Sequence, residues 1–148
     1  IGADSAGVSG MDLTIRKDPK VFKVGDFVIG CTSSFRMIQL LMFSFDPPKV
    51  YDKDLLEYMC TDFIDSVRQC FREGGYIQKY SDGDDKGGEF QVAENLHEYD
   101  SIGCGEDYAL GSIFNSNKSN AESIVMDALN AADNFSVGVS PPFNIVST

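Results

Sequence analysis

The sequence predicts an α+β fold in which helices cover the faces of a layered β-sandwich. The first thirty residues alternate short apolar segments with turn residues, as β-strands do, whereas most later apolar residues recur every three or four positions, as in helices. The chain has 148 residues, of which 43% are apolar, and this suits one core better than two independent ones. We therefore expect a single domain over residues 1–148.

The strands are expected mainly in the N-terminal part of the chain. Apolar residues predict short strands over residues 6–10, around Leu13 and Ile15, and over residues 21–24 and 27–29. Gly25 and Asp26 lie between the last two of these strands and predict a tight hairpin. Two further strand-like segments come much later, at residues 90–92 and 143–146.

Two helices are expected after this hairpin. Phe35 to Phe45 places apolar residues on one helical face, and Pro47-Pro48 stops the helix. The second helix starts near Asp52, a suitable N-cap, and ends at Gly74-Gly75. Its expected apolar stripe consists of Leu55, Met59, Phe63, Val67 and Cys70 or Phe71.

Two more helices are expected beyond a polar connection. Residues 80–88 are acidic and rich in glycine, which predicts a loop. A helical pattern then runs from about Glu106 to Phe114. The final helix opens with Ser119 and Glu122 in the spacing of a capping box. Strands, two helices, strands, two helices and a closing strand complete the predicted order.

Charge and hydropathy exclude several classes of function. The net charge of -11 argues against nucleic-acid binding, which requires clustered Lys and Arg. The longest apolar run, Met37 to Phe45, is interrupted by polar residues and is far shorter than the roughly 20 residues that span a bilayer. Ile1 to Ser5 has neither the basic nor the apolar region of an export signal. These features predict a soluble protein in the cytoplasm, without a membrane partner.

Cysteine and histidine offer little for a metal or cofactor site. The four cysteines lack C-x-x-C spacing, and we expect them to be reduced thiols. With His97 as the single histidine, a transition-metal centre has too few ligands. Asp82 to Asp85 lacks the regular spacing of a calcium loop, so we expect a solvated loop there. The sequence thus predicts no cofactor and no metal.

Three N-terminal segments carry a resemblance to a known family. Asp4 follows the small residues Gly2-Ala3, and sixteen positions later Lys20 precedes an apolar strand and a Gly-Asp turn. Fourteen residues further on, Ser34 lies where a strand gives way to a helix. In order and spacing, these segments resemble proteasome β-type and HslV-like N-terminal-nucleophile (Ntn) hydrolases.

Two C-terminal segments extend the resemblance over nearly the whole chain. Ile102-Gly103-Cys104-Gly105 is similar to the family's small-residue turn before a helix, where a serine normally supports the nucleophile's amine. Asp133-Asn134-Phe135-Ser136-Val137-Gly138 resembles the Asp-x-x-Ser-x-Gly segment of the amine-binding corner. Cys104 departs from the pattern, because a thiol is a weaker hydrogen-bond donor than a hydroxyl.

The resemblance implies a four-layer α-β-β-α sandwich and a threonine-type peptidase mechanism. In that mechanism the hydroxyl of an N-terminal threonine attacks the carbonyl, and its own α-amine takes the proton. Lys20 would hold positive charge beside the hydroxyl, and Asp4 would aim Lys20. The implied roles of the remaining residues are support of the amine by Cys104, Asp133 and Ser136, and an oxyanion-binding backbone N–H at Ser34.

The sequence departs from the family at two places. By the family's spacing, the nucleophile would precede Ile1 by about thirteen residues. A β-hairpin that the family has is also missing after residue 90, because Phe90 runs directly into Gln91. Our hypothesis is that the printed sequence lacks this first strand and this hairpin and that the full protein contains both.

Three functions remain open at this point. The first is a peptidase subunit that hydrolyses peptide (amide) bonds in peptides or unfolded proteins. The second is a catalytically inactive structural subunit of the same fold, which agrees with Cys104 in place of serine. The third is an unrelated acidic α+β binding module. For the first two, the resemblance implies a ring-shaped homo-oligomer and, by analogy, an ATPase partner.

Overall fold

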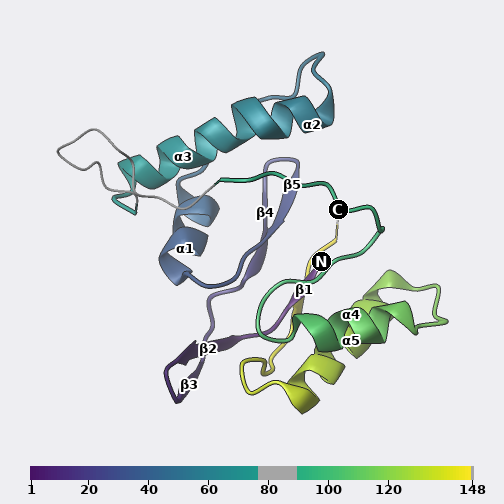
Figure 1. The fold of residues 1–148 in the computed structure, drawn as a ribbon. Coiled ribbons are helices and arrows are strands. Elements are labelled where there is room, and N and C mark those ends of the chain that lie inside the picture. Colours follow the sequence, from purple (N-terminus) through teal and green to yellow (C-terminus); the bar gives the residue numbers. More distant parts are fainter. Residues whose placement is uncertain (77–89, 148) are drawn as a thin grey trace. The chain divides into compact units, whose positions relative to one another are not determined.

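The computed structural model describes residues 1–76 and 90–147, which belong to two compact units (Figure 1). Unit 1 combines Ile1–Ser33 with His97–Thr148, and unit 2 is the continuous segment Ser34–Leu96. The loop predicted at residues 80–88 lies outside the described residues. One Ntn-hydrolase domain over residues 1–148 stays a prediction.

The strands of unit 1 pair as three two-stranded antiparallel sheets among the described residues. They are β1 (Gly2–Ala3) with β6 (Asn144–Ile145), β2 (Ala6–Ser9) with β3 (Asp12–Ile15), and β4 (Val21–Val24) with β5 (Phe27–Gly30). The structure is therefore a mixed α/β fold with small sheets, and the four-layer sandwich stays a prediction.

Two of these sheets are tight hairpins whose turns depend on glycine. Val24 pairs with Phe27 across Gly25 and Asp26, which confirms the predicted hairpin. Gly25 has a φ of 56°, and Gly10, in the turn between β2 and β3, has a φ of 60°. Residues with a Cβ adopt this left-handed region at a cost, so glycine favours both turns.

Helices α4 (Glu106–Phe114) and α5 (Ala121–Phe135) complete unit 1. The predicted bounds of α4 are confirmed. The predicted cap of α5 is wrong by one residue, because the N-cap is Asn120 and not Ser119. The Asn120 side chain accepts a hydrogen bond of 2.8 Å from the backbone N–H of Ser123, the bond that an N-cap supplies.

Close backbone approach holds the elements of unit 1 together. A Cβ on Gly2 would lie 2.3 Å from Cγ1 of Val125, so β1 rests directly on α5. A Cβ on Gly105, at the start of α4, would lie 2.7 Å from Cβ of Ala132 on α5. The small residues at these contacts let strand and helix backbones approach further than larger side chains would allow.

Unit 2 contains α1 (Phe35–Phe43) and a helical run made of α2 (Leu55–Tyr58), the π-helical turn η1 (Met59–Phe63) and α3 (Ile64–Glu73). The predicted end at Gly74-Gly75 is confirmed, with Gly75 at a φ of 70°. The helical run starts near Asp52, as predicted, but the N-cap is Asp54 and not Asp52. The Asp54 carboxylate accepts hydrogen bonds from the N–H groups of Leu56 and Glu57.

The core of unit 2 differs from the predicted apolar stripe at its N-terminal end. Leu55 is 62% exposed, whereas Tyr58 is fully buried and donates its hydroxyl to the Pro48 carbonyl at 2.5 Å. Burial raises the pKa of Tyr58. The π-helical turn changes the phase of the helix and explains why the regular spacing failed. Val67, Cys70 and Phe71 are buried as predicted.

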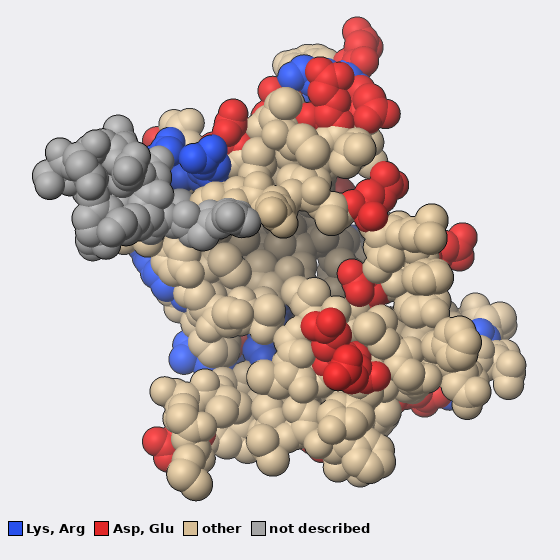
Figure 2. Space-filling model, in the orientation of Figure 1, with Lys and Arg blue, Asp and Glu red and all other residues tan. Residues whose placement is uncertain are grey.

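The strand predicted at residues 90–92 is wrong, because no strand forms there. Instead the Phe90 ring lies 6.2 Å from the Phe71 ring, and Arg68 lies over Phe90 at 5.6 Å. An aromatic contact with α3 therefore replaces the expected sheet pairing. The surface of unit 2 is acidic where α2 begins, as the red side chains near that helix show in Figure 2.

Candidate functional site

The first part of the candidate site is an ion pair between Asp4 and Lys20. Asp4 directly follows β1, and Lys20 directly precedes β4. The ammonium of Lys20 donates a hydrogen bond of 2.8 Å to Oδ1 of Asp4, and the side chains are only 14% and 13% exposed, respectively. Because the pair is shielded from water, its attraction is stronger than that of an exposed pair at the same distance.

The Asp4 carboxylate is held from two sides. Its Oδ2 accepts a hydrogen bond of 2.7 Å from the backbone N–H of Ala6, while Oδ1 receives Lys20. The first contact closes a local turn across Ser5 and fixes the direction of the carboxylate. The second contact then fixes the position of the Lys20 ammonium.

The second part of the site is the Cys104–Ser136 corner, which we define as Cys104, Ser136 and Gly138. Ser136 is the C-cap of α5, and its hydroxyl donates to the Cys104 carbonyl at 3.0 Å. The same hydroxyl accepts from the Gly138 N–H at 3.3 Å. A Cβ on Gly138 would lie 2.6 Å from Cβ of Cys104, so the corner requires glycine there.

Cys31 and Thr32 connect the two parts within unit 1. The Cys31 N–H donates to the Lys20 carbonyl at 2.9 Å, extending the β4–β5 pairing. The next residue, Thr32, lies against Gly103, where a Cβ would be 3.2 Å from the Thr32 hydroxyl oxygen. The dipeptide Cys31-Thr32 thus contacts both Lys20, which precedes β4, and Gly103, which precedes Cys104.

Asp133 and Ser34 have different surroundings from these residues. Asp133 lies on the exposed side of α5, and no hydrogen bond joins it to Ser136 in the part of the chain that the structure describes. Ser34 belongs to unit 2, where its side chain caps α1 by accepting from the Met37 N–H at 3.3 Å. Asp4 with Lys20, and Cys104 with Ser136, are therefore the predicted site residues in direct contact.

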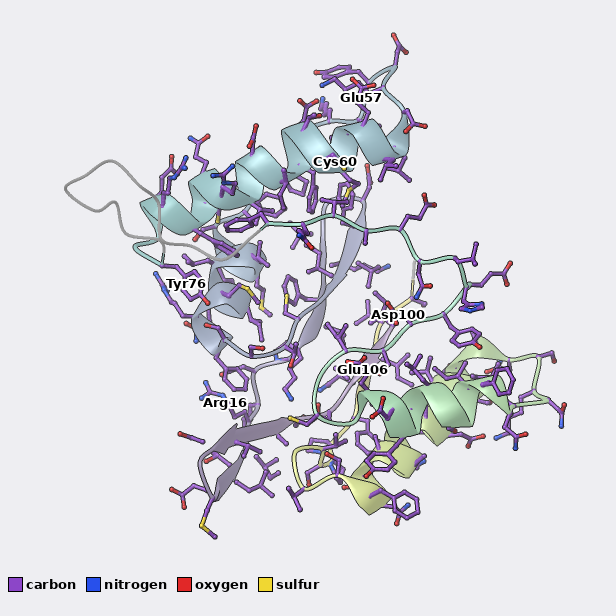
Figure 3. All side chains as sticks on the ribbon, viewed as in Figure 1. Arg16, Glu57, Cys60, Tyr76, Asp100 and Glu106 are labelled. Carbon is purple, nitrogen blue, oxygen red and sulfur yellow. The ribbon has the colours of Figure 1, made fainter. Side chains whose placement is uncertain are left out.

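The four cysteines are free thiols in different environments. Cys31 is partly buried, and this burial raises the pKa of its thiol from 9.0 to about 11. The Cys31 thiol thus stays protonated at neutral pH and is a poor nucleophile. Cys104 is exposed at the corner, and Cys60 is exposed on η1 (Figure 3).

Ser5 is a site residue to which sequence reasoning gave no role. It is 2% exposed, and its hydroxyl donates to the Pro142 carbonyl at 2.6 Å. The available signal was its place directly after Asp4 in a segment of small residues. A serine in such a segment is ordinarily exposed, so its burial depends on the Pro142 contact, which lies far away in sequence.

Neither metal sites nor membrane-spanning helices occur among the described residues. Residues 1–76 and 90–147 contain no group of three or more His, Cys, Asp or Glu side chains that could hold a metal ion. No helix in the same ranges is long and apolar enough to cross a membrane.

Comparison with known proteins does not assign the chain to a family. No family model matches it, and no curated protein is significantly similar to it. The resemblance to N-terminal-nucleophile hydrolases therefore depends on the order and spacing of residues in the sequence.

Proposed function

We propose that this chain is part of a proteasome-like peptidase subunit that uses an N-terminal threonine nucleophile located upstream of Ile1. The observation that carries the proposal is the shielded contact of 2.8 Å between Lys20 and Asp4. A lysine whose ammonium is held by a carboxylate, mostly out of water, is what the mechanism needs beside the attacking hydroxyl.

The proposed reaction is hydrolysis of a peptide bond through an acyl-enzyme. The threonine Oγ bonds to the carbonyl carbon while the threonine α-amine takes the hydroxyl proton. The C–N bond then breaks, and the proton passes to the departing amine. Water hydrolyses the resulting ester and restores the threonine. Lys20 stabilises the negative charge that develops on Oγ, and a backbone N–H at Ser34 is the proposed oxyanion donor.

The Cys104–Ser136 corner is the proposed support for the α-amine. Ser136 has a hydroxyl fixed by two hydrogen bonds, and the adjacent Cys104 is exposed. The resemblance adds Asp133 to the residues proposed to support the amine. By the same analogy, the full protein is a cytoplasmic ring of identical subunits that receives peptides or unfolded proteins, with an ATPase as partner.

A catalytically inactive structural subunit of the same fold is the second candidate. Two observations favour it: Cys104 stands where the family has serine, and Asp133 makes no hydrogen bond to Ser136 among the described residues. An unrelated binding module has less support, because it would leave Lys20 as an ordinary exposed lysine. Lys20 is instead mostly buried against a carboxylate.

The N-terminal residue of the natural full-length protein separates the two leading candidates. Intact mass and N-terminal sequencing of untagged protein should identify a processed threonine about thirteen residues before Ile1. Any residue there without a hydroxyl or thiol rules out the peptidase and leaves the structural subunit.

A matched pair of lysine variants then tests the site itself. Lys20→Met should lower kcat for a fluorogenic peptide by about 100-fold or more, because it removes charge stabilisation from the transition state. Lys23→Met is the control, since Lys23 lies three residues further along the chain, on β4, and is exposed. Equal activities of the two variants would contradict the proposed role of Lys20.

A further inference from the structure

Ser5 is hydrogen-bonded to two separate segments of unit 1, one at Arg16 and one over residues 140–144. Its N–H donates to the Ser140 carbonyl, and its carbonyl accepts from the N–H of Arg16, both at 2.9 Å. Its hydroxyl donates to the Pro142 carbonyl at 2.6 Å and lies 3.5 Å from the side-chain nitrogen of Asn144. Every hydrogen-bonding group of this buried residue therefore has a partner.

These bonds fix the turn that aims Asp4. The Asp4 carboxylate reaches across Ser5 to the N–H of Ala6, so the Ser5 backbone lies inside the turn that this bond closes. A rotation of the Ser5 backbone would move the carboxylate and, with it, the Lys20 ammonium 2.8 Å away. The backbone N–H of Arg16, at the end of β3 (Figure 3), donates to the Ser5 carbonyl and so fixes the same turn from a second segment.

The same bonds reach the segment that follows the Cys104–Ser136 corner. Ser140 and Pro142 come two and four residues after Gly138. The chain between them is short, and Val139 is buried, with its N–H donating to the Ser136 carbonyl at 3.2 Å. Ser5 therefore connects the turn of Asp4 to the loop that leaves Ser136.

We infer that Ser5 is a positioning residue that keeps the Asp4–Lys20 pair and the Cys104–Ser136 corner in a fixed relation. The inference rests on the proposed function, in which the nucleophile's hydroxyl meets Lys20 while its amine meets the corner. Both contacts form at once only if the two groups keep their separation, and a misplacement of about 1 Å can cost about 100-fold in rate.

The experiment compares Ser5→Ala, Ser5→Cys and the control Ser9→Ala in the full-length protein. Ser9 lies on β2 and is exposed, so its substitution is expected to leave kcat unchanged. Ser5→Ala should lower kcat about 10- to 100-fold with KM changed less than about twofold, after correction for the folded fraction by thermal unfolding. Ser5→Cys keeps a weaker donor of similar size, so its kcat should fall between that of the wild-type protein and that of Ser5→Ala.

A second measurement does not depend on peptidase activity. In protein labelled with ¹⁵N-lysine, the Lys20 ammonium signal, assigned by its loss in Lys20→Met, reports proton exchange with water. Ser5→Ala should accelerate this exchange by about tenfold or more, because the ammonium loses a fixed acceptor. Ser9→Ala should leave it unchanged.

The outcomes separate failure of this inference from failure of the proposed function. Unchanged kcat and unchanged Lys20 exchange in folded Ser5→Ala would overturn the positioning role, even if the protein is a peptidase. If the wild-type protein hydrolyses no peptide, the proposed function fails, and faster Lys20 exchange would still support Ser5 as the residue that positions the ion pair. If Ser5→Ala does not fold, Ser5→Cys is judged by the same two measurements.

Discussion

The shielded Asp4–Lys20 pair should contribute a measurable coupling energy to folding. Asp4→Asn keeps the size of the side chain but removes its charge, leaving Lys20 without an ionic partner and weakening the bond to the Ala6 N–H. Breaking a fully buried pair costs about 3–5 kcal/mol. Because these side chains keep 13% and 14% exposure, we expect a smaller cost, about 2–3 kcal/mol.

A double-mutant cycle isolates the interaction from the loss of either side chain. It comprises Asp4→Asn, Lys20→Met and the double variant, each unfolded in urea and followed by circular dichroism and tyrosine fluorescence. The double variant buries no unpaired charge, so the two single effects should not add. We expect a coupling energy of about 1–2 kcal/mol.

The Lys53–Asp62 pair provides a matched control in the same chain. Its nitrogen and oxygen are also 2.8 Å apart, but the two side chains are 39% and 40% exposed. Water and salt screen such a pair, so its cycle should give no resolvable coupling in 1 M salt. Coupling at Asp4–Lys20 no larger than at Lys53–Asp62 would refute the claim that shielding strengthens the site pair.

Three further predictions test the packing, the thiol and the helix cap. Gly2→Ala should destabilise unit 1 by about 1–3 kcal/mol, because the new Cβ would overlap Val125. Gly111→Ala, which has open space at its Cβ, should not destabilise it. Urea unfolding of the two variants measures the difference. Burial raises the pKa of the Cys31 thiol from 9.0 to about 11. The contribution of this thiol to the free energy of unfolding should therefore be complete below pH 9 and disappear as the pH approaches 11. In Cys31→Ala this pH-dependent loss should be absent. Asp54→Ala should cost about 1 kcal/mol in thermal stability and Asp52→Ala almost nothing, since Asp54 caps α2; equal effects would contradict the observed cap.

Local sequence patterns predicted the helices and strands well where an element depends only on residues close together in the sequence. The hairpin at Gly25-Asp26 and helix α4 follow from turn chemistry and spacing over a few residues. The two N-cap errors arise where competing local choices are nearly equal: Asn120 and Ser119 both suit an N-cap, as do Asp54 and Asp52. In each pair, the residue whose side chain accepts a hydrogen bond from the first turn of the helix is the N-cap. The sequence alone does not show which side chain makes that bond.

The site was predictable only where the resemblance supplied a distant partner. The Asp4–Lys20 contact was expected from spacing that the family shares, and the structure brings the two side chains together. The role of Ser5 depends on Pro142, 137 residues away, and no local pattern links them. The π-helical turn at Met59–Phe63 was likewise missed, because a change of helical phase leaves the apolar spacing almost regular.

The division of unit 1 between two distant segments has a consequence for how the chain folds during synthesis. Strand β1 pairs with β6, so Gly2 cannot form its strand contact until Ile145 has been synthesised. At a synthesis rate of roughly 5 to 20 residues per second, this delay lasts about 7 to 30 s. Unit 2 is continuous in sequence and can form during this interval. The turn that aims Asp4 needs Ser140 and Pro142, so the Asp4–Lys20 pair takes its final position only after residues 140–142 have been synthesised.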